Sequence, residues 1–189
     1  MAGADTSQRI LDIAERLVQT RGFNGFSYAD IAASLRVTKA SLHYHFPAKA
    51  ELGKRLIERY TANFLTALAA IDRAQADAPG KLRRYVAIYA AVLRDKRMCL
   101  CGMLAAEYAT LPRPMQAEIK RFFDENERWL SKVLEQGREA GAARFSGPAR
   151  EVARALVGSL EGAMMLARSY GEISRFQLAA DRLLGELSG

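Results

Sequence analysis

The segment Phe26–Lys49, FSYADIAASLRVTKASLHYHFPAK, constrains the fold most because it contains two helix starts only eleven positions apart. Ser27 is a favourable N-cap, and Asp30 stands at the third helical position, so the pair predicts a capping box. After a short break, Thr38 is the next N-cap candidate. The segment therefore predicts two short helices joined by a tight turn.

The second of these helices has an outward face that suits a DNA groove. At 100° per residue and with Leu42 pointing inward, Ala40 and Tyr44 point most nearly outward, and Ser41 and His43 lie on the flanks. This helix carries no carboxylate. Such a face can reach base edges and phosphates in the major groove. The alternative is an amphipathic hairpin on the protein surface without a DNA function.

A longer stretch, DIAASLRVTKASLHYHFPAKAEL, resembles the DNA-binding signature of TetR-family transcriptional regulators. The resemblance extends from about Ile10 to Tyr60, although family members usually carry Tyr where this chain has His43. It implies a homodimer that binds a palindromic operator in double-stranded DNA and responds to a small-molecule effector. The resemblance and the helix faces together predict these DNA-binding residues: Ser27, Thr38, Lys39, Ala40, Ser41, His43, Tyr44, His45 and Lys49.

The remaining sequence predicts an all-α fold. Apolar residues recur at helical spacing in about nine segments, and no segment reads convincingly as a strand. One helix is expected to run over 49–77, because no helix breaker occurs before Pro79. We expect an N-terminal three-helix helix-turn-helix domain over 1–48. The long helix then joins it to a C-terminal helical ligand-binding and dimerisation domain over 49–189.

The charge distribution favours the same DNA-binding surface. The net charge is +7, and residues 36–60 hold six Lys and Arg against two Asp and Glu. No run of 18 apolar residues is present, so no membrane span is expected, and the N-terminus lacks the apolar core of a signal peptide. We therefore expect a cytoplasmic protein with no membrane partner.

No catalytic motif is evident. The sequence contains no Gly-rich phosphate loop, no nucleophile elbow and no suggestive carboxylate pair, so we expect no enzyme activity and no cofactor. The two histidines, His43 and His45, both lie in the DNA-binding segment, so no metal site is expected. A helical ligand-binding protein without a DNA function is the alternative class.

The middle of the chain is rich in Met, aromatic and Cys residues, which suit an adaptable apolar pocket. Glu107 is on the same helical face as Met103 and is a candidate partner for a cationic effector. The alternative is that these side chains form an ordinary core. The predicted ligand-binding residues are Tyr85, Tyr89, Met98, Cys99, Met103, Glu107, Tyr108, Phe122, Trp129 and Met164.

Cys99 and Cys101 offer a second way of sensing. Residues at i and i+2 of one helix point about 200° apart, so these thiols cannot bond together or chelate a metal without unwinding. Either thiol could still react with an oxidant or electrophile, and a buried inert thiol is the alternative. Sensing of an oxidant or electrophile by cysteine is therefore the alternative hypothesis for how this regulator responds.

The last two helices, expected over 149–170 and 174–187, are the predicted dimer surface. Gly158 and Gly162 share one face and allow a second helix to approach closely, whereas close packing within one subunit is the alternative. The resemblance implies a four-helix interface built from these helices of two chains. The predicted interface residues are Leu156, Gly158, Gly162, Leu183 and Leu187. The sequence thus predicts a repressor that a small apolar or amphipathic effector releases from its operator.

Overall fold

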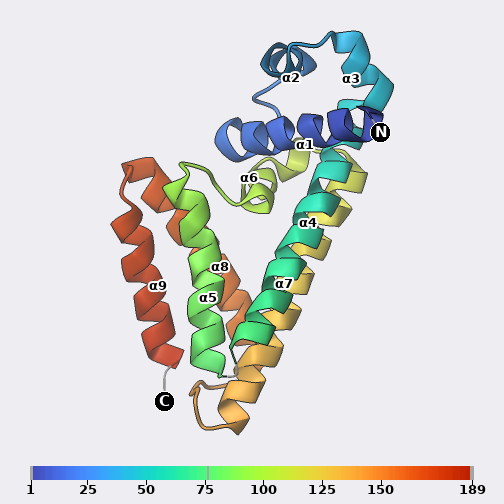
Figure 1. The fold of residues 1–189 in the computed structure, drawn as a ribbon. Helices are drawn as coiled ribbons and strands as arrows, with labels where there is room; N and C mark the ends of the chain where they lie inside the picture. The colour runs from blue at the N-terminus through green and yellow to red at the C-terminus, as the bar shows by residue number, and fades with distance from the viewer. Residues whose placement is uncertain (1, 76, 188–189) are drawn as a thin grey trace. The chain divides into compact units, whose positions relative to one another are not determined.

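The computed structural model describes residues 2–75 and 77–187, which form nine α-helices, one short 3-10 helix and no strand (Figure 1). The all-α prediction is confirmed. The helices are α1 (Ala2–Arg21), α2 (Tyr28–Leu35), α3 (Lys39–His45), α4 (Lys49–Ala74), α5 (Ala78–Arg94), α6 (Leu100–Ala106), the 3-10 helix η1 (Tyr108–Thr110), α7 (Arg113–Glu139), α8 (Ala149–Tyr170) and α9 (Ile173–Leu187).

The chain folds into two compact units. Unit 1 contains the residues up to Ala62 together with Cys99–Arg121, and unit 2 contains Asn63–Met98 and the residues from Phe122 onward. We expected a division after residue 48, whereas the structure groups α6 and the first parts of α4 and α7 with the helix-turn-helix. The grouping follows the close approach of α6 to α1, which local sequence patterns do not reveal.

The core of unit 1 is built on the apolar stripe of α1. Ile10, Ala14 and Val18 recur at helical spacing and are fully buried. Leu42 of α3 is also buried, which anchors that short helix to the core. Isolated helices this short are marginal in water, so α3 depends on this burial and on its end caps.

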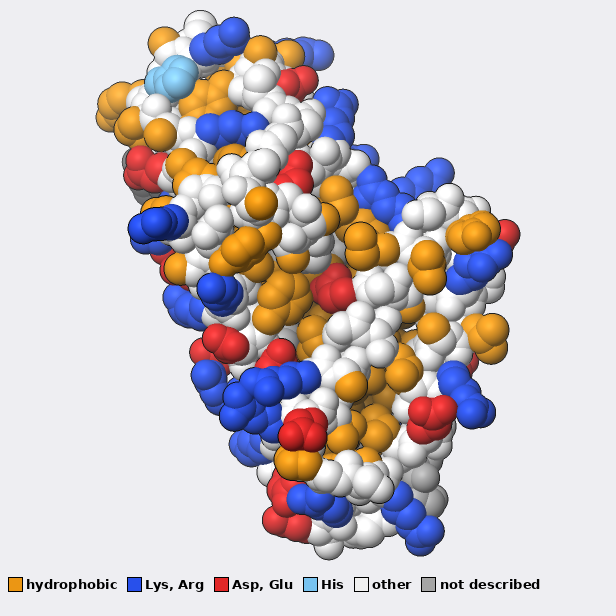
Figure 2. Space-filling view, turned by 180° about the vertical axis from the view of Figure 1, so that it is seen from behind, with side chains coloured by type: hydrophobic (Ala, Val, Ile, Leu, Met, Phe, Trp, Pro, Cys, Tyr) orange, Lys and Arg blue, Asp and Glu red, His pale blue; other side chains and the backbone are white. Residues whose placement is uncertain are grey.

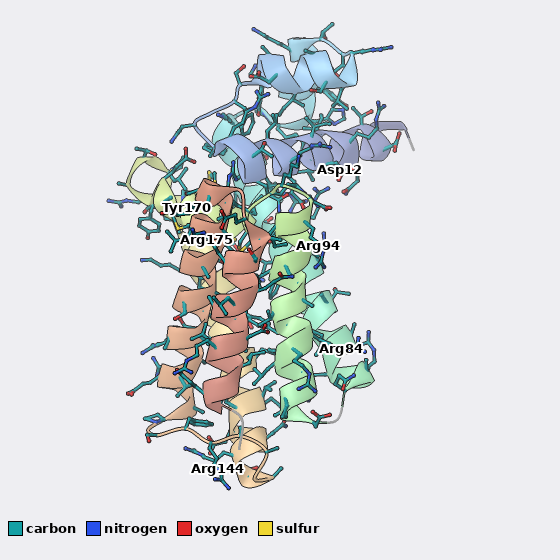
Figure 3. All side chains as sticks on the ribbon, turned by 90° about the vertical axis from the view of Figure 1, so that its left-hand side faces the viewer. Asp12, Arg84, Arg94, Arg144, Tyr170 and Arg175 are labelled. Atoms are coloured by element: carbon teal, nitrogen blue, oxygen red, sulfur yellow. The ribbon has the colours of Figure 1, made fainter. Side chains whose placement is uncertain are left out.

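Unit 2 is a helical bundle in which α9 packs against both α8 and α5 (Figures 1 and 3). The predicted stripe of α8 is buried, including Leu160 and Met164. Phe176 of α9 and Tyr85 of α5 are fully buried as well. Burial of each such apolar side chain stabilises the fold by roughly 1.5–3 kcal/mol.

The packing of α4 in unit 1 gives a test of this core. A Cβ atom on Gly53 would lie 2.6 Å from Met115 Sδ and 2.8 Å from the Phe23 ring. We expect Gly53→Ala to lower the free energy of unfolding by about 1–3 kcal/mol through overpacking. Gly185→Ala is the matched control, because a Cβ there meets open space and alanine favours the helix. Urea denaturation that finds both variants equally stable would contradict this packing.

Candidate nucleic-acid interface

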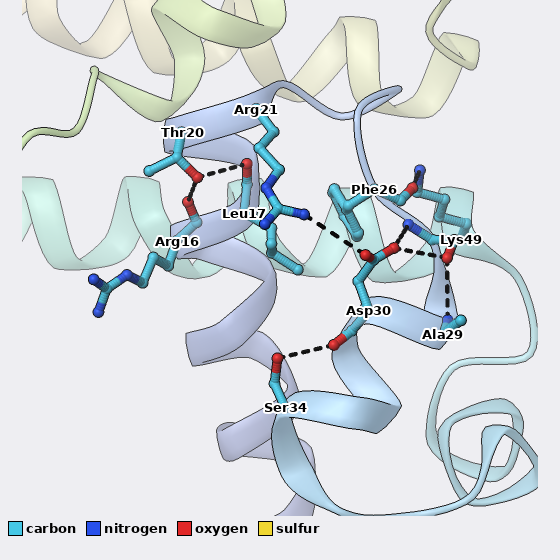
Figure 4. A network of polar contacts seen from close by, with 10 residues as sticks. Arg16, Leu17, Thr20, Arg21, Phe26, Ala29, Asp30, Ser34 and Lys49 are labelled. Carbon is cyan, nitrogen blue, oxygen red and sulfur yellow. Dashed lines mark hydrogen bonds and ion pairs between the residues drawn. The ribbon is translucent and has the colours of Figure 1, made fainter.

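The start of α2 is fixed by the predicted capping box (Figure 4). The backbone N–H of Ala29 donates to Ser27 Oγ at 3.2 Å, and the backbone N–H of Ser27 donates to the Asp30 carboxylate at 2.8 Å. The Ser27 hydroxyl also donates to that carboxylate, and these bonds lower the pKa of Asp30. Arg21 of α1 lies 3.6 Å from Asp30, so the cap is also linked to α1.

The turn between α2 and α3 contains a feature that sequence reasoning missed. Arg36 has φ 57° and ψ 44°, in the left-handed region where glycine or asparagine is usual. Its backbone N–H donates to the carbonyl of Ala33, which closes α2. Thr38 then caps α3, as predicted, by accepting a hydrogen bond from the backbone N–H of Ser41 at 3.2 Å. The exposed Arg36 side chain is therefore presented beside the start of α3.

A buried hydrogen bond holds the end of α3. The Tyr28 hydroxyl donates to the carbonyl of Phe46 at 2.7 Å. Burial, with a smaller effect from the Glu51 carboxylate, raises the pKa of Tyr28 to about 12. The hydroxyl is therefore a proton donor at neutral pH. This bond fixes the end of α3 relative to α2, and a recognition helix needs such a fixed orientation.

The outward face of α3 carries the predicted residues. Lys39, Ala40, His43 and Tyr44 are exposed, and Tyr44 presents 84% of its surface. Ser41 and His45 are half-buried. On the face drawn in Figure 2, a histidine and neighbouring Lys and Arg side chains lie at the surface of unit 1. The arrangement fits a surface that meets DNA, whereas contact with DNA stays a prediction for each residue.

Lys49 corrects one prediction. We expected it to contact DNA, but its Nζ donates to the carbonyls of Phe23 and Phe26. The ammonium also lies 4.5 Å and 4.2 Å from the centroids of those two rings. Burial lowers the pKa of Lys49. The lysine therefore stabilises the loop between α1 and α2 from inside unit 1.

Two family models match this chain. Residues 10–56 match the model for bacterial regulatory proteins of the tetR family, and residues 78–183 match the tetracyclin repressor-like C-terminal domain. The chain belongs to the TetR family. The resemblance seen in the α2–α3 segment is thereby confirmed, and with it the assignment as a DNA-binding transcriptional regulator.

Solved structures and curated relatives agree with the family. A TetR-family regulator from Agrobacterium tumefaciens has a TM-score of 0.96 at 30% identity, over 99% of this chain and 100% of that one. A TetR regulator from Legionella pneumophila has a TM-score of 0.89 at 31% identity, over 97% of each chain. The transcriptional repressor NemR of Escherichia coli K12 is 27% identical over 171 residues, which cover 87% of this chain and 84% of NemR.

Glu107 corrects a second prediction about this TetR-family chain. We expected it to be a candidate partner for a cationic effector, but its carboxylate accepts hydrogen bonds from the backbone N–H groups of Phe23 at 2.6 Å and Asn24 at 3.2 Å. The Asn24 side chain also donates to Thr110 Oγ1 at 2.8 Å. The segment after α6 therefore caps the loop between α1 and α2, and the half-buried Glu107 has a structural role.

Four predicted ligand-binding residues cluster in unit 2. The Tyr85 hydroxyl donates to Asn126 Oδ1 at 3.0 Å and lies 3.0 Å from the Tyr89 hydroxyl. The Trp129 ring stacks on Tyr85 with centroids 5.6 Å apart, and Phe122 lies in the same aromatic core. This cluster places a few polar groups inside an apolar region, as ligand sites do. Met98 and Met164 are also buried in unit 2.

The remaining predicted ligand residues, Cys99, Met103 and Tyr108, belong to unit 1. Cys99 and Cys101 are buried and form no disulfide bond. Cys99 is the N-cap of α6, where its Sγ accepts from the backbone N–H of Gly102 at 3.5 Å. The structure therefore divides the predicted ligand set between the two units.

The α8–α9 surface differs in part from the prediction. Leu156 and Leu187 are buried within the subunit, so neither presents its side chain outward, while Leu183 is half-buried. A Cβ atom on Gly158 or Gly162 would meet nothing within 4 Å, so close packing inside this subunit does not explain the glycines. The large exposed apolar side chains of these helices are Met165, Leu166, Tyr170 and Leu178.

Two kinds of feature are absent from residues 2–75 and 77–187. None of the helices there is long and apolar enough to cross a membrane. Within the same ranges, no group of three or more His, Cys, Asp or Glu side chains is arranged to hold a metal ion.

The Glu107 contact predicts a stability effect in unit 1. Glu107→Gln keeps the side-chain shape but removes the charge from both hydrogen bonds, so we expect the free energy of unfolding to fall by about 1–3 kcal/mol. Glu186→Gln is the matched control, because that carboxylate forms an exposed ion pair with Arg182 worth about 0–1 kcal/mol. Equal losses for both variants in urea denaturation would count against the capping role of Glu107.

Proposed function

We propose that this chain is a homodimeric repressor that binds a palindromic operator through α3 of each subunit and releases it when a small apolar or amphipathic effector binds unit 2. The observation that carries the proposal is the exposed face of α3, which is held by Thr38 at its start, by the buried Leu42 at its middle and by the Tyr28–Phe46 hydrogen bond at its end. A short helix fixed in this way can present the same side chains to every operator half-site.

Roles follow from the positions on α3. Tyr44 points most nearly away from Leu42 and is 84% exposed, so it is assigned to base edges. His43 lies on the flank of α3 with its ring 4.8 Å from the Tyr28 ring, so its exposed edge is assigned to base edges or nearby phosphates. Lys39 at the start of α3 and Arg36 in the preceding turn are assigned to phosphates, since both are exposed cations. Ser27 and Thr38 also have exposed positions at helix starts, where backbone amides favour anions.

The apolar face of α8 and α9 supports a second copy of this chain as the partner. Met165 and Leu166 are 51% and 60% exposed, and Leu178 of α9 is 75% exposed. Gly158 and Gly162 leave open space on α8, into which a neighbouring helix can fit. A palindromic operator requires two recognition helices related by a two-fold axis, which a homodimer supplies.

The proposed transmission path follows the chain between the units. The chain crosses from one unit to the other three times: within α4, in the segment before α6, and within α7. Within unit 1, Glu107 ties the segment after α6 to the loop that precedes α2. An effector at the Tyr85 cluster that favours a different position of these segments would lower operator affinity in proportion to its preference for that state.

Cysteine-based sensing is the second candidate. It is favoured by the position of Cys99, whose sulfur caps α6 and lies 3.9 Å from the Tyr60 hydroxyl. Oxidation of that sulfur would disturb the start of α6. Operator release by mild oxidant that is lost in a variant combining Cys99→Ser and Cys101→Ser would favour this candidate over a reversible ligand.

The first test is a quantitative gel shift with the DNA upstream of the protein's own gene. We expect specific binding by the wild type, and we expect Tyr44→Ala to weaken it by roughly 1–3 kcal/mol. Tyr44→Phe separates the ring from the hydroxyl, and circular dichroism checks that each variant is folded. Absence of specific binding by the wild type would refute the operator assignment, and unchanged binding by Tyr44→Ala would refute the role of this face.

The second test concerns the homodimer. Gly158→Leu adds a side chain where the subunit itself has open space, so it should not overpack the monomer. At a helix–helix interface the same side chain would clash, and we expect a higher monomer fraction in sedimentation velocity and weaker operator binding. Ala117→Leu on the exposed face of α7 is the matched control. A monomer fraction that is the same in both variants would exclude this face as the interface.

A further inference from the structure

A hollow of about 620 Å³ lies in unit 2, outside the Tyr85 cluster. The end of α5, the turn that follows it, the end of α8 and the start of α9 surround it. Figure 3 shows Arg94 at this end of α5, and Tyr170 and Arg175 near the turn between α8 and α9. Its volume falls in the range of about 300–1,000 Å³ that is usual for small-molecule sites.

The walls of the hollow are strongly basic. Arg94, Lys96, Arg97 and Arg168 line it, and none of the lining residues is acidic. The Asp95 carboxylate forms an ion pair with Arg97 at 2.6 Å, so the positive charge is partly offset from outside the lining. Like charges around one hollow repel each other, and an anion placed among them would relieve that repulsion.

The preference of cations for helix ends accounts for only part of this arrangement. Arg94 and Arg168 lie in the last turns of α5 and α8, where positive charge is favourable. Lys96 is different, because its φ of 57° places a lysine in the left-handed conformation that glycine adopts without strain. Its N–H donates to the carbonyl of Leu93 at 2.9 Å, so this conformation is part of the helix end. The chain thus carries a cation here despite a conformational cost.

The rest of the lining is apolar. Leu93, Ala167 and Ile173 contribute hydrocarbon surface beside the four cations. A hydrated inorganic anion gains nothing from such surface, whereas an alkyl or aryl group does. The hollow therefore combines groups that would bind the two parts of an amphipathic anion.

We propose that this hollow binds an organic anion with an apolar body, such as an alkyl carboxylate, sulfate or phosphate. The guanidinium groups of Arg94 and Arg168 hold the anionic head through charge-assisted hydrogen bonds. The apolar body lies against Leu93 and Ile173. This binding site is separate from the Tyr85 cluster, and its existence does not depend on the proposed operator function.

The test is isothermal titration calorimetry of the full chain, without DNA, using decyl phosphate below its micelle concentration. Inorganic phosphate controls for the head group alone, and decyltrimethylammonium controls for the apolar tail. We expect decyl phosphate to bind most tightly of the three compounds, and we expect its affinity to fall as the salt concentration is raised. Arg94→Gln and Arg168→Gln should each weaken binding about tenfold. Arg73→Gln, an exposed arginine of α4 outside the hollow, should stay within about twofold.

Lys96→Gly separates binding from folding. Glycine removes the charge and also removes the strain at φ 57°, so a purely structural role predicts an equal or higher melting temperature with unchanged affinity. The proposed site predicts weaker binding of decyl phosphate in a variant that is at least as stable. The proposal is overturned if decyltrimethylammonium or inorganic phosphate binds as tightly as decyl phosphate. It is equally overturned if the Arg94, Arg168 and Lys96 variants all bind like the wild type.

Discussion

The arrangement of unit 1 depends on one carboxylate. Glu107 accepts hydrogen bonds from the backbone amides of Phe23 and Asn24, which lie 84 and 83 residues earlier in the chain. Lys49 donates to carbonyls of the same loop, so the loop's donors and acceptors are both satisfied by charged side chains. A loop that would otherwise be among the more mobile parts of the fold is thereby fixed.

That fixed loop determines how α2 and α3 are presented. It leads directly into Ser27, the cap of α2, and α2 in turn supplies the Tyr28 hydroxyl that holds the end of α3. The recognition helix has seven residues, too few to be stable alone. Its orientation therefore rests on a series of contacts that begins at a residue following α6. This series gives a physical reason why α6 belongs to unit 1.

Local patterns allowed most of the fold to be predicted. Helix starts and apolar stripes depend on residues a few positions apart, so the caps at Ser27 and Thr38 and the buried stripe of α1 were predictable. The roles of Lys49 and Glu107 were not, because their partners lie 23 to 84 residues away and only the folded chain brings them together. A charged residue near a helix end reads as a surface group until its partner is known.

The predicted dimer surface also shows what local sequence patterns cannot determine. Helical periodicity identifies an apolar residue, but it does not say which of two apolar faces meets the interior. The sequence pattern therefore places Leu156 and Leu187 at the interface although both side chains are buried, while Leu166 and Leu178 are the exposed leucines of these helices. Gly158 faces open space, and its place in an interface stays a prediction that rests on the stability cost of a glycine in mid-helix unless packing makes use of it.

The internal use of charge also bears on how DNA binding responds to salt. Of the six Lys and Arg in residues 36–60, Lys49 is bonded to the loop, Arg59 pairs with Asp12 and Glu15, and Lys54 and Arg55 pair with Glu58. Among the described residues of this range, that leaves the exposed Arg36 and Lys39. Each phosphate neutralised releases about 0.9 counterion from B-DNA. A net charge of +7 therefore overstates the electrostatic attraction that residues 36–60 can offer to DNA, and we expect recognition by this segment to rest more on shape and hydrogen bonding than on counterion release.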